Sequence, residues 1–317
     1  MIKIPFNPGT FSQEAKDLVS GVNLTFQYDN IKSRLSQTGV AIAKTLGKET
    51  YEKLVAINME DSEEKLLALD YLKRAMLNFS FYHHLIFIAV RISNDGVTTK
   101  KNDDETTAFK YQTDELKISL VESAWFWMDQ LYELLNTHTE VFTEWQESSQ
   151  KKQLKSLYVT SDDFRYIFGV ESTHFFVSSM PLIRKTIDED IACRADLDEV
   201  KILEADTSAV KALKNEISAL IKKAIVYRSL SLACKLYSYY ELPAPLRRSA
   251  DDELHKGTSS EEYVKKSVSA MLANNADQIL LKLETKLQAL KNKNTASSRP
   301  IAPEIITDEQ DKFCCSI

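Results

Sequence analysis

The sequence is poor in glycine and proline, with seven of each among its 317 residues. This is about a third of the usual content, and these two residues supply most tight turns and sheet corners. A sheet-rich fold is therefore disfavoured, and we expect an all-α protein. Hydrophobic residues at 44% and charged residues at 27% are close to globular averages, so most of the chain should bury a core.

An excess of positive charge is also missing. The formal net charge is −6, which provides no basic surface for a nucleic acid. The longest strongly apolar run is Leu85 to Val90, and residues 1–11 lack the apolar core of a signal peptide. We therefore expect neither a membrane span nor export by a signal peptide. The four cysteines lack metal-ligand spacing and favour a reducing compartment: Cys193, Cys234, Cys314 and Cys315.

Recognisable motifs of catalysis and cofactor binding are absent. The sequence has no glycine-rich phosphate loop, no GxSxG and no HExxH. His83 and His84 point about 100° apart on a helix, so they cannot bind one metal together, and a packed or interface pair is favoured. The acidic runs 103–105 and 188–190 lack the alternating pattern of a calcium loop, which favours solvated surface. We expect no catalytic, cofactor-binding or metal site.

Helical periodicity predicts the main elements. In the first half, helices are expected at residues 30–46, 62–92 and 114–136, with Gly47 ending the first. In the second half they are expected at 178–191, 208–240 and 260–293, after a short helix beginning near Ser161. Pro243 and Pro245 should end the helix that precedes them, because proline removes a backbone donor.

The two halves show weak internal similarity. Residues 33–46 align with 178–191 at a lag of 145, and residues 73–80 align with 222–229 at a lag of 149. We therefore predict two stacked helical units, 1–148 and 149–293, that arose by duplication. Residues 294–317 are polar, contain two prolines and lack helical periodicity, which predicts an extended or disordered tail.

Three places are candidates for interaction with other molecules. The first is the polar stretch 94–110, expected as an exposed loop or β-hairpin. The second is the aromatic group around residue 126, for which core packing against the neighbouring unit and an intermolecular contact both stay open. The third is the tail, whose spaced apolar residues could enter grooves of a neighbour. The candidate residues are Asp95, Thr98, Lys100, Lys101, Trp125, Trp127, Ile305 and Phe313.

Four segments resemble a known family: VRISNDGV (90–97), THTEVFTEW (137–145), LYVTSDDFRYIF (157–168) and FFVSSMPLIRKTIDEDI (175–191). Their order and spacing, over roughly residues 20–250, are similar to an uncharacterised family of phages and prophages of Bacteroidota, including crAss-like phages. The resemblance implies a head–tail connector, a neck-ring adaptor between portal and tail, with no catalytic residues to carry over. The tail after Lys293 has no counterpart in that pattern.

The resemblance further implies partners and location. We expect a homo-oligomeric, dodecameric ring in the virion neck that contacts the portal and neighbouring ring proteins. DNA would pass through its lumen without specific binding, and no membrane is involved. The alternatives are a helical scaffold or adaptor unrelated to phage, and a prenylated helical protein, because Cys314-Cys315-Ser316-Ile317 fits the C-a-a-X pattern.

Overall fold

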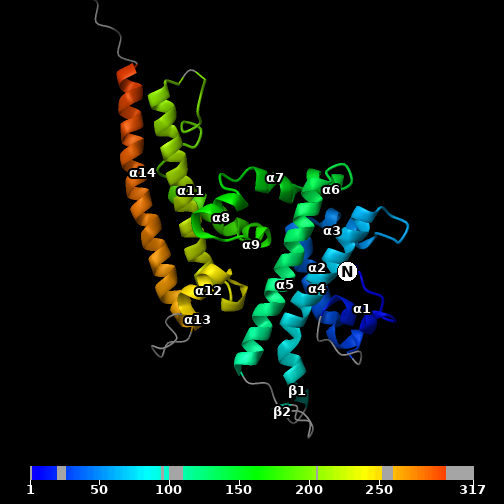
Figure 1. Cartoon of the computed structure of the whole chain (residues 1–317). Coiled ribbons are helices and arrows are strands. Elements are labelled where there is room, and N and C mark those ends of the chain that lie inside the picture. The colour runs from blue at the N-terminus through cyan, green and yellow to red at the C-terminus, as the bar shows by residue number, and fades with distance from the viewer. Residues whose placement is uncertain are drawn as a thin grey trace, which may run out of the picture.

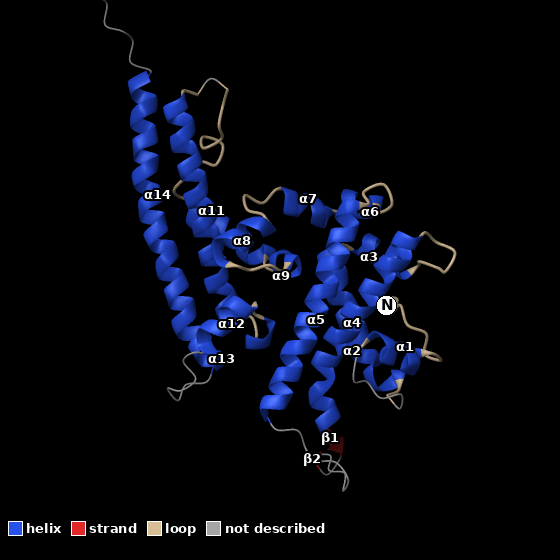
Figure 2. Ribbon diagram, viewed as in Figure 1, coloured by secondary structure: helices blue, strands red, loops and turns tan. Residues whose placement is uncertain are grey.

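Helices make up most of the described chain, so the expected all-α class is confirmed (Figure 1, Figure 2). The structure is a computed structural model that describes residues 2–19, 26–93, 96–99, 110–204, 206–251 and 260–297. None of the helices in these ranges combines the length and apolar character needed to cross a bilayer.

The first half is built on a pair of long helices. They are α4 (Glu63–Ala89) and α5 (Lys110–Thr137), which pack along each other. Three shorter helices cover α4: α1 (Phe11–Leu18), α2 (Tyr28–Leu46) and α3 (Lys48–Val55). Gly47 ends α2 with a φ of 91°, a backbone conformation that favours glycine. The three helices expected in this half are therefore present.

The end of α4 differs from the expectation. The sequence predicted helix to residue 92, but the chain enters strand β1 (Val90–Ser93) directly after Ala89. β1 pairs antiparallel with β2 (Gly96–Thr99), with Val90 opposite Thr99 and Ser93 opposite Gly96. The β-branched residues Val90 and Ile92 before an Asn-Asp-Gly sequence favour a hairpin over further helix. The hairpin extends from one end of the α4–α5 pair (Figure 1).

Four short helices connect the halves: α6 (Thr143–Glu147), α7 (Ser149–Lys155), α8 (Ser161–Phe168) and α9 (Thr173–Ser178). α8 begins with a capping box, in which Thr160 and Asp163 each accept a hydrogen bond from the other's backbone N–H. Asp163 also pairs with Lys222 Nζ, 3.0 Å away on a later helix. The carboxylate thus fixes the start of α8 against the second half.

The second half contains another long pair, α11 (Ser208–Leu236) and α14 (Ser269–Ser297). α10 (Met180–Thr186) packs on α11 and continues as the π-helical turn η1 (Ile187–Ile191). The 3₁₀ turn η2 (Tyr239–Glu241), α12 (Ala244–Asp251), α13 (Ser260–Tyr263) and the π turn η4 (Val264–Val268) connect the pair. The expected helix 178–191 is interrupted at Ser179, which caps both α9 and α10. The helix expected to reach residue 240 ends at Leu236.

The two halves share an arrangement and a core. In each, one shorter helix packs on the first member of a long pair, α2 on α4 and α10 on α11. A single cluster of buried hydrophobic residues runs through both halves, from Phe6 to Leu290. The boundary at residues 148 and 149 and the duplication stay predictions. α14 continues to Ser297, past residue 294 at which the tail was expected to begin, and residues 298–317 lie outside the described residues.

Candidate functional site

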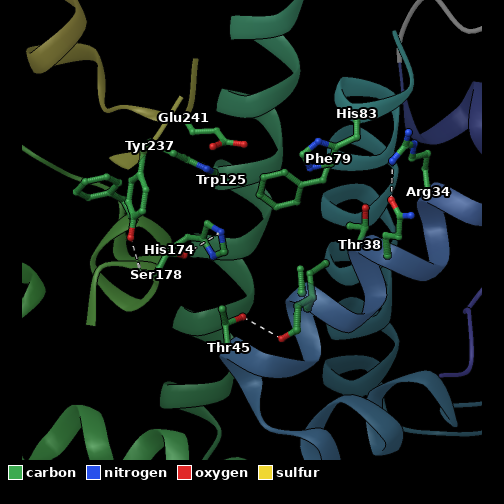
Figure 3. Close-up of a pocket in the computed structure, with 14 residues that line it drawn as sticks. Arg34, Thr38, Thr45, Phe79, His83, Trp125, His174, Ser178, Tyr237 and Glu241 are labelled. Carbon is green, nitrogen blue, oxygen red and sulfur yellow. Dashed lines mark hydrogen bonds between the residues drawn. The ribbon is translucent and has the colours of Figure 1, made fainter. Parts of the chain in front are cut away.

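A cavity of about 450 Å³ lies where the two halves meet (Figure 3). Helices α2, α4 and α5 contribute from the first half, and α9 and the segment 237–241 contribute from the second. Its lining residues are Arg34, Gln37, Thr38, Ala41, Ile42, Thr45, Phe79, His83, Trp125, His174, Phe175, Ser178, Tyr237 and Glu241. This size is within the range of roughly 300–1,000 Å³ typical of ligand pockets.

Aromatic rings form much of the wall. The centroid of Trp125 lies 5.7 Å from that of Phe175, and the centroid of Phe79 lies 5.5 Å from that of His174. Tyr237 donates a hydrogen bond through its hydroxyl to the carbonyl oxygen of Ser178, at 3.0 Å. These contacts hold the walls in place, and the cavity is open to an apolar or aromatic group.

The aromatic group around residue 126 is divided between different surroundings. Trp125 lies partly buried against α9 of the second half, at the cavity wall. Trp127 stays within the first half, where it contacts the Tyr71 ring and the Arg74 guanidinium. Phe126, between them, is 53% exposed. The structure therefore places Trp125, not Trp127, at the junction of the halves.

His174 is the most deeply buried titratable group of the wall. Burial lowers its pKa to about 4, so the ring is neutral at pH 7. Its Nε2 lies 3.4 Å from Ser178 Oγ, whereas its Nδ1 has no hydrogen-bond partner among the described residues. A buried polar atom without a partner costs roughly 1–3 kcal/mol. Because this nitrogen is itself buried, it is not part of the open surface of the cavity.

Asp129 lies behind the wall and joins α5 to α9. Its carboxylate accepts hydrogen bonds from the backbone N–H of His174 at 2.6 Å and from Ser172 Oγ at 3.2 Å. Burial raises the pKa of Asp129 to about 6, although these hydrogen bonds oppose the shift. Because the carboxylate contacts the backbone of His174 and not its ring, the two residues do not form the orienting pair of a hydrolytic triad.

Charged residues also line the cavity. Arg34 donates a hydrogen bond to Gln37 Oε1 at 2.6 Å and lies over the Phe87 ring. The pKa of His83 is lowered by burial and further by the Arg34 charge, while burial raises the pKa of Glu241. Arg34 is the one Arg or Lys among the described residues of the lining, and its guanidinium stays charged at all working pH values. An anionic group of an occupant would therefore be placed best beside it.

The other candidate groups are dispersed. Within the described ranges, no three His, Cys, Asp or Glu residues are grouped to hold a metal. Asp190 pairs with Arg228, and Glu189 lies 3.9 Å from Lys185. Burial raises the pKa of Cys234 to about 12, which makes its thiol a poor nucleophile. His84 contacts the rings of Phe26 and Phe87 and is not among the residues that line the cavity.

The predicted interaction residues of the loop and tail are only partly placed. Thr98 lies in β2, opposite Arg91 of β1. Asp95, Lys100 and Lys101 in the loop, and Ile305 and Phe313 in the tail, lie outside the described residues. The cavity itself was not predicted. The available signal was the placement of His83 and Phe79 in the helix that is apolar nearly all round, but the partners come from four other segments.

Comparison with known proteins gives a partial match. Residues 42–154 match a family of unknown function, DUF6712. This region, about a third of the chain, includes the α4–α5 pair and five lining residues, Ile42, Thr45, Phe79, His83 and Trp125. No curated protein and no solved structure matches the chain.

Proposed function

We propose that this chain is a virion structural protein, a head–tail connector that acts by oligomeric assembly in the neck of a tailed phage. The four segments described above resemble an uncharacterised family of phages and prophages, and the neck-ring role that this resemblance implies is the basis of the assignment. The all-α architecture, built from two long helical pairs, is compatible with it.

The observation that carries the proposal is a set of exposed apolar side chains on two distant parts of the molecule. Met271 and Leu281 on α14 are 47% and 65% exposed, and α14 forms one lateral edge (Figure 1). Leu67 on α4 and Met59, shortly before α4, are 39% and 92% exposed in the first half. A ring needs two different complementary faces on each subunit, because its contacts are head-to-tail. Exposed apolar residues on separate helices of the two halves are compatible with this requirement.

The ends of the long pairs provide surfaces for layers above and below. The β1–β2 hairpin projects beyond one end of α4–α5, and the α11–α14 pair extends beyond the helical body at the other end (Figure 1). In the proposed neck, the lateral edges bind further copies in a dodecameric ring. The ends then contact the portal and the next ring, while the protein is made in the host cytoplasm.

Light scattering and negative-stain microscopy of the full chain test the proposal, alone and with the portal protein of the same genome. We expect rings of uniform size, either alone or on the portal. Leu281→Lys should weaken ring formation, whereas Lys282→Gln, at the adjacent exposed position, should not. A chain that stays monomeric in both conditions would contradict the proposal.

A further inference from the structure

We propose that the cavity between the halves receives the C-terminal segment of a neighbouring copy, with the Phe313 ring among the aromatic walls and the acidic residues before it near Arg34. This inference rests on the assembly proposed above and identifies a site for one of its contacts. It starts from the cavity, whose volume of about 450 Å³ leaves room for an aromatic side chain.

The chemistry of the lining suits such a segment. Phe79, Trp125, Phe175 and Tyr237 provide an aromatic environment, in which a further ring gains favourable edge or offset contacts.

The charges are complementary as well. Asp308, Glu309 and Asp311 precede Phe313 within five residues, while Lys312 is the one cation among them. Arg34 is the permanent cation of the cavity, and its guanidinium can donate two hydrogen bonds to one carboxylate in a bidentate contact. Among residues 298–317, Phe313 is the one aromatic residue.

Chain length favours a neighbouring copy as the donor. Ser231 Oγ donates to the Ser269 carbonyl oxygen at 2.7 Å, so the end of α11 near the cavity lies beside the start of α14, not beside Ser297. The 29 residues of α14 cover about 43 Å. Phe313 follows Ser297 by 16 residues, a reach of at most about 55 Å. A return along α14 would use most of this reach before the chain crossed α11.

Disulfide trapping in the full chain tests the placement, because Cys314 directly follows Phe313. Ala41 is exposed and lines the cavity, while the adjacent Val40 is exposed and does not. Ala41→Cys and matched Val40→Cys variants are prepared with Cys193→Ser and Cys315→Ser and oxidised with diamide. Light- and heavy-isotope chains are mixed beforehand, so that mass spectrometry distinguishes links between chains from links within one.

We expect a link from position 41 to Cys314 between chains, at least about tenfold more abundant than the link from position 40. Phe313→Ala should reduce the link from position 41 to the level of the control. Equal linking at positions 40 and 41, or links within one chain, would overturn the inference. Particle incorporation is measured separately: a specific link between chains in a protein that is absent from virions would overturn the proposed function and leave this docking site standing.

Discussion

At the scale of single residues, the junction between the halves depends on two buried groups with opposite responses to pH. His174 has a folded-state pKa of about 4, below its usual 6.5, so its stabilising contribution is present above pH 6.5 and lost as pH falls through 4. Asp129 has a folded-state pKa of about 6, above its usual 3.8, so its contribution is present below 3.8 and lost as pH rises through 6. Between pH 4 and 6 the two effects oppose each other.

We therefore predict that substituting either residue exposes the pH response of the other. In Asp129→Asn, the amide oxygen still accepts from the His174 backbone, and the free energy of unfolding should fall by about 2–3 kcal/mol from pH 6.5 to 4. In His174→Gln it should rise by a similar amount over the same change. Urea unfolding at a series of pH values measures the free energy of unfolding of both variants. The unsubstituted chain is the reference, and its free energy should change less over this pH range. Slopes of equal sign in the two variants would contradict this account.

The sequence predicts the surroundings of these residues only in part. The aromatic group around Trp125 had to meet more than its own helix, because consecutive helical positions diverge by about 100°. That argument left core and intermolecular contacts open. The position of Trp125 against Phe175 depends on the packing of α5 on α9, between residues 50 apart in the chain. No local pattern encodes a contact of that kind.

At the scale of elements, the long helices were predictable and their ends were less so. α2, α4, α5, α11 and α14 follow from apolar periodicity over many residues, which a strand does not reproduce. The strand at Val90 was missed because the apolar run through Leu85 to Val90 reads equally as buried helix. The short helices α6, α7 and α9 have too few turns for periodicity to identify them.

Gly39, in the middle of α2, gives a prediction about helix contact. A Cβ there would lie 2.8 Å from Tyr51 Oη, which donates to the Lys3 carbonyl oxygen at 2.9 Å. Gly39→Ala should destabilise the fold by about 1–2 kcal/mol, because the lost hydrogen bond outweighs the gain in helix propensity. In a Tyr51→Phe background the same change should be neutral or stabilising. Urea unfolding of the four proteins measures the coupling, and additive effects would be evidence against the steric conflict.

The hairpin region gives a second prediction at this scale. β1 and β2 pair with each other at the end of α4–α5, so the helical core does not depend on them. Deleting residues 98–106 should leave helicity and melting temperature unchanged but abolish incorporation into particles. A replacement of the same residues by a Gly-Ser segment of equal length should also fold normally and also be absent from particles. This control keeps the length of the loop and removes only its side chains. Normal incorporation of the deletion variant would exclude a contact role for this loop.

At the scale of the whole molecule, the distribution of charge predicts how an assembled ring treats DNA. The net charge is −6, and some of the cations are already paired with carboxylates. Lys222 contacts Asp163, and Arg247 pairs with Glu122. Because the 46 acidic residues outnumber the 40 basic ones, the chain as a whole repels a phosphate backbone, so a lumen lined by it should let duplex DNA pass without holding it.

We accordingly predict a Kd weaker than about 10⁻⁴ M for a labelled duplex at roughly physiological salt, with little change at lower salt. Fluorescence anisotropy across a salt series measures both quantities. Glu199→Lys with Glu204→Lys is the matched positive control, since both glutamates are exposed and their reversal adds positive charge without entering the core. The double variant should bind more tightly and with a steeper dependence on salt. Tight, salt-sensitive binding by the unsubstituted chain would mean that paired cations such as Lys222 and Arg247 are released to phosphates, and the lumen would then be adhesive.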